Sequence, residues 1–229
     1  MTESTADESR LIEKVKSLAD QQTIEWMEKK SKELVKLMAY YRCALMEIET
    51  KFNVLNVEFS LQHDRNPINS IKSRLKSLPS IQDKLERKHL PMTLKAIEEN
   101  LNDVAGVRVI CAFPEDVYTL ANALLKQDDI ELIDRKDYIQ NPKPSGYRSL
   151  HLIVSVPIFL ENEKRIMKVE IQLRTIAMDC WASLEHQLRY KKDFAFTEEM
   201  ADELYSCAQI SADLDRRMDV LRKAVDVQR

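Results

Sequence analysis

The 229-residue chain is 44% hydrophobic and 32% charged, an ordinary balance that supplies enough apolar material for a core. Its formal net charge of −3 excludes a protein that coats nucleic acid nonspecifically, because such proteins need excess cations. No apolar run approaches the ~20 residues of a membrane-spanning helix, and residues 1–10 lack the apolar core of a secretion signal. The four cysteines form no Cys-X-X-Cys pair, so we expect a reduced cytoplasmic protein.

The N-terminal part of the chain favours helices. Residues 8–50 contain no glycine or proline, and apolar side chains recur there at spacings of three and four, which predicts a long amphipathic helix. Residues 52–62 are more typical of a strand. Pro67 opens a predicted helix that is interrupted near Pro79, and a second helix is predicted over residues 80–88, with a short one after it.

Strands dominate the second half. Four are predicted, over residues 107–113, 130–138, 150–158 and 165–174. Helices are predicted from Pro114, over residues 176–190 and from Thr197, whose hydroxyl can cap the last helix. That last helix carries an apolar heptad pattern similar to the pattern of residues 34–52. We therefore expect the two terminal helices to pair, either within one chain or between chains.

These elements predict an α+β fold, with a mixed sheet of about five strands flanked by helices and a long helix at each end. The expected organisation is an N-terminal helical extension over residues 1–50, a central domain over residues 51–195 that contains the sheet, and a C-terminal helix over residues 196–229. There is no internal repeat and no low-complexity linker.

The most informative segment runs from Lys136 to His151 (KDYIQNPKPSGYRSLH), between two predicted strands. It contains Gly146, one of only two glycines, and we expect the backbone there to adopt a conformation that other residues resist. Tyr147 and His151 are an even number of positions apart, so on a strand they would point to the same face. An aromatic platform beside a polar ring suits a flat base attached to phosphates.

Two acidic residues are candidates for metal binding or catalysis. Residues 168–174 alternate strictly, which places Glu170 and Gln172 on one face of a strand and the apolar residues on the other. Taken alone, that alternation indicates a sheet with one solvent-facing side. Asp103 lies beside the other glycine, just before a buried strand, where a carboxylate can coordinate Mg²⁺ or simply stabilise a turn.

A basic helix supplies a third element. Ser80, Lys84 and Arg87 lie at positions i, i+4 and i+7 and therefore share one helical face, with Arg74 and Lys76 preceding them. A triphosphate needs several convergent cations of this kind. A solvated helix face explains any one of these residues equally well, and an RNA-binding patch could explain the group.

Together these elements contain the parts needed for Mg²⁺-dependent phosphoryl chemistry between two nucleotides: two carboxylates, two cationic clusters and an aromatic platform. The chain has no Walker A motif, and two glycines cannot build a glycine-rich phosphate loop. Phosphate groups must therefore be bound by side chains.

Four separated motifs resemble those of the synthetase domain in the Rel/Spo family of (p)ppGpp synthetases, and most closely those of the stand-alone, RelP-type small alarmone synthetases. The motifs occur in the family's order, as residues 73–76 (SRLK), 103–108 (DVAGVR), 136–151 and 170–175 (EIQLRT). The resemblance begins near residue 30 and extends to the end of the chain. It implies a nucleotidyltransferase-like synthetase domain.

The resemblance implies a GTP pyrophosphokinase (GTP diphosphokinase) of stress signalling, which transfers the β,γ-pyrophosphate of ATP to the 3′-hydroxyl of GDP or GTP and releases AMP. Asp103 and Glu170 would bind Mg²⁺, and Glu170 would also deprotonate the acceptor hydroxyl. The residues implied for ATP are Arg74, Lys76, Ser80, Lys84, Arg87 and Arg108. Those implied for the acceptor are Lys136, Lys143, Tyr147, His151, Gln172 and Asp179. The role of Asp179 stays open, because some relatives have Asn there.

Further expectations concern partners and alternatives. Bifunctional members of the family also carry a metal-dependent hydrolase domain with a His-Asp pair. In this chain His63-Asp64 is the only such pair, and 229 residues leave no room for a separate hydrolase domain, so we expect no alarmone degradation. The heptad-like stripes predict a symmetric homo-oligomer, the resemblance implies a tetramer, and the lack of a long apolar run predicts no membrane association. We also expect Zn²⁺ to inhibit by occupying the Asp103 and Glu170 site. The alternatives are a nucleotide-responsive RNA-binding protein, with RNA binding not expected as the main role, and a nucleotidyltransferase that releases pyrophosphate instead of AMP.

Overall fold

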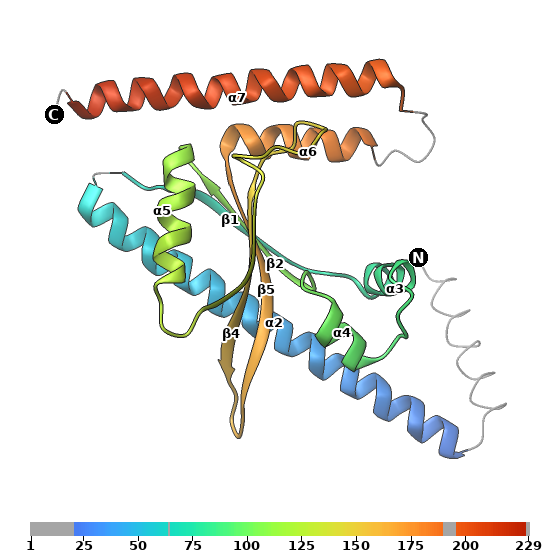
Figure 1. The fold of residues 1–229 in the computed structure, drawn as a ribbon. Coiled ribbons are helices and arrows are strands. Elements are labelled where there is room, and N and C mark those ends of the chain that lie inside the picture. The colour runs from blue at the N-terminus through green and yellow to red at the C-terminus, as the bar shows by residue number, and fades with distance from the viewer. Residues whose placement is uncertain (1–20, 64, 190–195, 228–229) are drawn as a thin grey trace, which may run out of the picture. The chain divides into compact units, whose positions relative to one another are not determined.

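A computed structural model describes residues 21–63, 65–189 and 196–227 (Figure 1). The elements in chain order are α2 (Gln21–His63), β1 (Ile68–Leu75), α3 (Leu78–Arg87), α4 (Leu94–Asn100), β2 (Ala105–Cys111), α5 (Pro114–Leu125), β3 (Glu131–Asp137), β4 (Leu150–Phe159), β5 (Lys164–Thr175), α6 (Ile176–Arg189) and α7 (Glu198–Val227). The chain divides into two compact units, Met1–Tyr40 and Tyr41–Arg229, and all five strands belong to the second.

The five strands form one mixed sheet in the order β1-β2-β5-β4-β3. Only β2 and β5 run parallel, and the other three pairs are antiparallel. Helices flank this sheet, as Figure 1 shows. The predicted α+β class, with about five strands and long terminal helices, is therefore confirmed.

The core is built from the apolar side of β5 and from helices. Val169, Ile171 and Leu173 are fully buried, as their alternation with polar residues predicted. Ile48 and Phe52 of α2 are also fully buried. The opposite side of β5 carries the polar residues of the alternation, so the core holds in place the sheet face on which the candidate site is built.

Two predicted elements were wrong. Residues 52–62 continue α2, because no glycine or proline interrupts that helix and adding a turn to an existing helix is easier than starting a strand. Residues 68–75 form β1 instead of a helix, because hydrogen bonding to β2 along the whole strand overrides a weak helical pattern. β1 is an edge strand with mostly half-buried and exposed side chains, so it lacks the alternation of a buried strand.

The C-terminal helix begins as predicted, since the Thr197 hydroxyl accepts a hydrogen bond of 3.3 Å from the backbone N–H of Met200. It packs on α6, where the Trp181 indole donates to the Leu204 carbonyl at 2.9 Å. Four apolar side chains of its heptad pattern remain 46–59% exposed, namely Leu214, Met218, Leu221 and Val225. Within the part of the chain that the structure describes, these side chains therefore remain available for contact with a partner.

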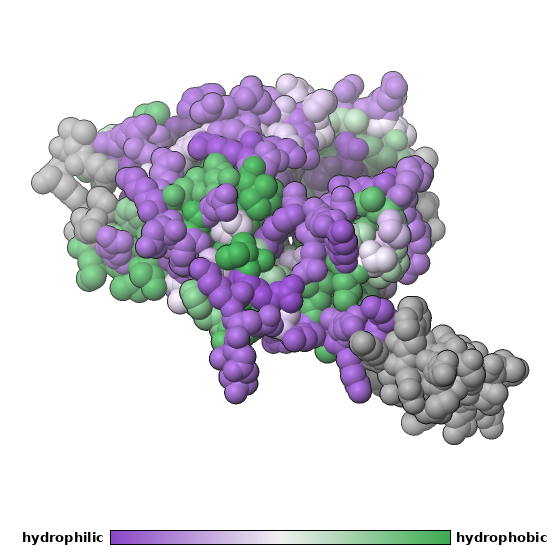
Figure 2. Space-filling model, turned by 60° about the horizontal axis from the view of Figure 1, so that its bottom comes forward, coloured by the Kyte–Doolittle hydropathy of each residue, from purple (hydrophilic) through white to green (hydrophobic). Residues whose placement is uncertain are grey.

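The first part of the long helix predicted over residues 8–50 lies outside the described residues, as does Asp64 of the His-Asp pair. None of the described helices is both long and apolar enough to cross a membrane. The face seen in Figure 2 is largely hydrophilic and is interrupted by separate hydrophobic patches.

Candidate active site

The candidate site occupies the polar side of the sheet, where a pocket of about 250 Å³ opens between β1, β2 and β5. The residues that line it are Lys72, Ser73, Arg74, Gly106, Val107, Arg108, Glu170 and Gln172. The pocket therefore brings together three of the four motifs that are separated in the sequence.

A row of polar residues crosses all five strands in register. Lys72 on β1 pairs with Arg108 on β2, Arg108 pairs with Gln172 on β5, Gln172 pairs with His151 on β4, and His151 pairs with Lys136 on β3. Residues directly opposite one another in a sheet point to the same side. The sheet itself thus places cations from its two edges around a central amide and imidazole.

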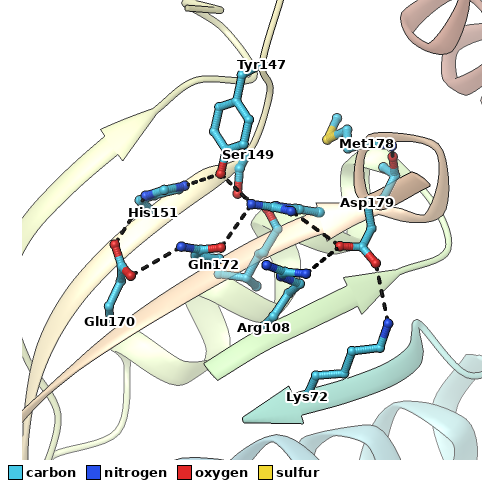
Figure 3. Close-up of polar contacts among 12 residues, drawn as sticks. Lys72, Arg108, Tyr147, Ser149, His151, Glu170, Gln172, Met178 and Asp179 are labelled. Atoms are coloured by element: carbon cyan, nitrogen blue, oxygen red, sulfur yellow. Dashed lines mark hydrogen bonds and ion pairs between the residues drawn. The ribbon is translucent and has the colours of Figure 1, made fainter. Parts of the chain in front are cut away.

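Glu170 lies two positions before Gln172 on the same face of β5 (Figure 3). Its carboxylate accepts a 3.2 Å hydrogen bond from the Gln172 amide and lies 3.6 Å from the Nδ1 atom of His151. Burial raises the pKa of Glu170, but the hydrogen bond and the charge of His151 together outweigh burial and hold the pKa below its usual value. Glu170 is therefore an ionised base at neutral pH.

Asp103 precedes β2 and is held by two lysines. Its Oδ2 atom lies 2.9 Å from the ammonium of Lys76 and 2.6 Å from that of Lys84. Burial raises the pKa of Asp103, but the hydrogen bonds and charges of Lys84 and Lys76 lower it further than burial raises it. The charge of Asp103 also acts on Glu170, so the two carboxylates share one electrostatic environment.

The donor set fits Mg²⁺ when a nucleotide is present. The Oδ1 atom of Asp103 is buried without a hydrogen-bond partner, which leaves one carboxylate oxygen available to a cation. Within residues 21–63, 65–189 and 196–227, no group of three or more His, Cys, Asp or Glu side chains could hold a metal. Mg²⁺ is commonly held by one or two carboxylates together with substrate phosphates and water, so the carboxylates of Asp103 and Glu170 are the kind of ligand that it takes.

The residues predicted to bind ATP are only partly brought together. Arg74 and Arg108 line the same pocket. Ser80 lies in the first turn of α3, where its hydroxyl accepts a hydrogen bond of 2.9 Å from Ser77. Arg87, in the last turn, is exposed and donates to the Asp83 carbonyl of its own helix, so it does not reach the pocket.

An aromatic cluster stands beside Glu170. The rings of Tyr138, Tyr147 and His151 contact one another edge to face, with centroids 5.3–6.0 Å apart. The Tyr147 hydroxyl and the His151 Nε2 atom are 2.8 Å apart, so the two side chains do meet as predicted. Tyr147 precedes β4, however, and reaches His151 from the loop. The Lys143 ammonium lies 4.7 Å and 4.8 Å from the ring centres of Tyr138 and Tyr147.

Gly146 shapes the loop that carries Tyr147. Its φ angle is +86°, a conformation that glycine adopts without the strain other residues incur, so the prediction for this residue is confirmed. The Gly146 N–H donates to the Lys143 carbonyl at 2.8 Å, and the Lys143 N–H donates to the Tyr147 carbonyl at 3.1 Å. These bonds fold the loop back, so that Lys143 lies over the Tyr147 ring.

The sequence did not single out Arg174, which is 4% exposed and connects both halves of the site. Its guanidinium donates to the Tyr147 hydroxyl at 2.5 Å, to the Gln172 amide oxygen at 3.0 Å and to Asp179 at 3.3 Å. The alternation of residues 168–174 could have revealed Arg174, because it places this residue on the polar side of the strand, two positions after Gln172.

Asp179, in the first part of α6, neutralises a group of cations. Besides Arg174, its carboxylate lies 3.2 Å from Arg108 and 3.6 Å from Lys72. Lys72 was missed because its segment was predicted to be a helix. Lys136 belongs to the polar row, but its ammonium lies 3.2 Å from Asp134, whose hydrogen bond and charge raise the pKa of Lys136.

The sequence of the chain matches a known family model. The model described as "Region found in RelA / SpoT proteins" matches residues 73–195. The chain is 47% identical over 186 residues to GTP pyrophosphokinase YwaC of Bacillus subtilis, which covers 81% of this chain and 89% of that protein. It is 34% identical over 194 residues to GTP pyrophosphokinase YjbM of the same organism, covering 85% and 90%.

Solved structures agree with this match. The crystal structure of small alarmone synthetase 2 from B. subtilis superposes with a TM-score of 0.77 at 42% identity, over 84% of this chain and 99% of that one. Small alarmone synthetase 1 of the same organism, bound to its product pppGpp, gives a TM-score of 0.77 at 34% identity, over 85% and 98%. The same synthetase bound to AMPCPP gives 0.72 at 31% identity, over 85% and 98%. Because the motifs, the sheet and the length all match, the chain belongs to the RelA/SpoT family, among the small alarmone synthetases.

Proposed function

We propose that the chain is a GTP pyrophosphokinase that transfers the β,γ-pyrophosphate of ATP to the 3′-hydroxyl of GDP or GTP, producing AMP and ppGpp or pppGpp for stress signalling. The observation that carries this proposal is the position of Glu170. It is an ionised carboxylate between a cationic pocket and an aromatic cluster, each suited to one nucleotide. The proposed catalytic domain, residues 51–195, contains every residue assigned here.

ATP would occupy the pocket between β1 and β2. Arg74 and Arg108 line it, and their planar guanidinium groups can stack on both sides of an adenine ring. Lys76 and Lys84 converge on Asp103 and would hold the phosphates together with Ser80 and Arg87. Arg87 would have to turn away from its own helix to do so.

The acceptor nucleotide would occupy the aromatic side. A guanine base would stack on Tyr147, on the ring face that now attracts the Lys143 ammonium. Lys136, Lys143, His151 and Gln172 would position its ribose and phosphates. Asp179 would act indirectly, because its ion pairs hold the side chains of Arg174 and Arg108 in place.

In the proposed reaction, Glu170 accepts the proton of the 3′-hydroxyl while the oxygen attacks the β-phosphorus of ATP in line, and the bond to the α-phosphate oxygen breaks to release AMP. The contacts of Glu170 with His151 and Gln172 would keep its carboxylate oriented toward the acceptor. Asp103 and Glu170 would hold Mg²⁺, which when bound neutralises charge on the transferred phosphates.

The test is product analysis of ATP with GDP or GTP on nuclease-treated protein. We expect AMP and a guanosine 3′-pyrophosphate, whereas release of pyrophosphate would identify a nucleotidyltransferase. Glu170→Gln should reduce turnover by roughly 10²–10⁴ without changing the fold, because the amide cannot accept the proton. Wild-type turnover in this variant would exclude Glu170 as the base. Added ppGpp should remain intact, since we propose no hydrolase activity.

We also propose that Zn²⁺ inhibits the enzyme at Asp103 and Glu170, because protein ligands generally bind later transition metals such as zinc more tightly than Mg²⁺. Zinc prefers four ligands and would disturb the octahedral arrangement that Mg²⁺–ATP requires. A Zn²⁺ titration on nucleotide-free protein, repeated with Asp103→Asn, tests this proposal. Equal affinity in both proteins would place the zinc elsewhere.

A further inference from the structure

One face of α7 lies against the elements that carry the acceptor half of the site. Leu204, Ala208, Ser211 and Asp215 are spaced at i, i+4, i+7 and i+11, so they share that face. The Leu204 carbonyl accepts the indole hydrogen bond of Trp181 on α6, and Ala208 is 3% exposed. Met218 and Val225 continue the heptad positions of Leu204 and Ser211, so the exposed heptad residues extend this side of the helix toward its C-terminal end.

The first contact fixes the loop before Tyr147. A Cβ atom built on Gly146 would lie 2.5 Å from the Ala208 Cβ atom, a distance that real Cβ atoms do not show. The backbone of the loop therefore touches α7 directly. Tyr147 itself packs against the cluster of Trp181 and Ala208, so the proposed stacking platform rests partly on α7.

The second contact fixes the junction between β5 and α6. The Thr175 hydroxyl donates a 2.7 Å hydrogen bond to the Asp215 carboxylate and accepts one of 3.1 Å from the Met178 N–H in the first turn of α6. Thr175 is fully buried and Asp215 is 6% exposed. Since the hydroxyl has one proton, donation to Asp215 leaves its lone pairs free to bind the helix N–H.

The junction between β5 and α6 lies in the sequence between Arg174 and Asp179, which bind each other in the candidate site. Thr175 directly follows Arg174, which holds the Tyr147 hydroxyl, and it lies four positions before Asp179, which holds Arg174 and Arg108. A change in the direction of the first turn of α6 would therefore move Asp179 relative to Arg174 and Arg108. The lysines that hold Asp103 come from other elements, the end of β1 and α3.

We infer that Asp215 is a positioning residue for the acceptor nucleotide, acting through the Thr175 hydroxyl on Arg174, Asp179 and Tyr147. This inference rests on the proposed function and adds to it a residue that does not touch the substrate. Burial raises the pKa of Asp215, opposed by the hydrogen bond of Thr175 and the charge of Arg148. The chain thus holds a desolvated carboxylate at a position where an apolar residue would pack at lower cost.

The test compares Michaelis constants for the two substrates. In Asp215→Ala we expect the KM for GDP to rise about tenfold, the effect of losing one buried hydrogen bond that orders the site, while the KM for ATP changes by less than about twofold. Asp215→Asn should recover most of the loss, because the amide oxygen still accepts from Thr175. Asp202→Ala removes an exposed carboxylate from the same helix and should change neither constant.

A double-mutant cycle with Thr175→Val, which keeps the side-chain shape, tests whether Asp215 acts through the Thr175 hydroxyl. The double variant should be no worse than Thr175→Val alone, because both single variants remove the bond between Thr175 and Asp215, and Thr175→Val also removes the bond from the Met178 N–H. Calorimetry without ATP measures the dissociation constant of GDP. In Asp215→Ala this constant should rise by the same factor as the KM for GDP. The inference fails if the two KM values rise equally, if the effects add, or if GDP affinity is unchanged. Should Asp215→Ala not fold, Asp215→Asn and Thr175→Val decide alone. A wild type that forms no AMP would overturn the proposed function instead.

Discussion

Arg174 holds Tyr147 in two ways: its guanidinium donates a 2.5 Å hydrogen bond to the Tyr147 hydroxyl, and its central carbon lies 5.0 Å from the centre of the same ring. The two residues are 27 positions apart and come from different elements. Because the same guanidinium also binds Gln172 and Asp179, the ring orientation is tied to β5 and α6. This contact joins the proposed guanine platform to the pocket proposed for ATP.

Replacing Arg174 by lysine should therefore damage the site although the charge is kept. A lysine has one ammonium and cannot bind Tyr147, Gln172 and Asp179 in one plane. We expect the KM for GDP to rise by roughly tenfold or more, as loss of a buried charged hydrogen bond costs about 1.5–3 kcal/mol. Steady-state kinetics measure this, with Arg216→Lys on the exposed face of α7 as the matched control. An unchanged KM would show that Arg174 serves the fold alone.

Two substitutions at Tyr147 separate stacking from hydrogen bonding. Tyr147→Ala should raise the KM for the guanine nucleotide ten- to hundredfold, because stacking on a base contributes roughly 1–3 kcal/mol. Tyr147→Phe keeps the ring and loses only the bonds to His151 and Arg174, so its effect should be smaller. Both variants should leave the KM for ATP nearly unchanged. Equal losses for both substrates would indicate a purely structural tyrosine.

The ion pairs of Asp103 should make stability depend on pH in a defined direction. The folded-state pKa of Asp103 lies below the ordinary value of 3.8. Its contribution to stability is therefore fully present above the unfolded-state pKa and is lost as the pH falls through the folded-state pKa. We expect urea unfolding to show a constant difference between wild type and Asp103→Asn from about pH 7 to about pH 5, shrinking at lower pH. A difference that grows on acidification would contradict the assignment.

The exposed apolar stripe of α7 should be covered in solution by other copies of the chain. Four side chains from Leu214 to Val225 are 46–59% exposed, and closed symmetric assemblies are the usual way to bury such a surface. We expect a symmetric homo-oligomer, and a tetramer from the family resemblance. Light scattering on wild type and on Met218→Glu measures the assembly. A wild-type monomer at micromolar concentration would overturn this prediction.

Several features could be predicted because they depend on local pattern alone. The alternation of residues 168–174 identified β5, its buried face and the polar face that carries Glu170 and Gln172. The rarity of glycine pointed to Gly146, whose φ angle is indeed positive. Asp103, Tyr147 and His151 were chosen as candidates because the motifs around them are specific. Each of these signals is contained within a few consecutive residues.

Other features could not be predicted, because they depend on long-range pairing. β1 has a helical spacing of apolar residues and became a strand only by hydrogen bonding to β2. That pairing places Lys72 beside Arg108, so the wrong prediction of a helix over these residues is also the reason that Lys72 was missed. Residues 52–62 look like a strand in isolation and are helical because a helix already formed before them continues.

The sequence by itself determined the chemistry of this protein: which carboxylates, cations and aromatic rings it holds, and the family they match. Only the tertiary structure decided how they are connected. Arg174 became the link between Tyr147 and Asp179, and Asp215 came to bind Thr175 across 40 positions of sequence. The physical reason is that hydrogen bonds and ion pairs depend on distances in space, and those distances are set only when strands pair and helices pack.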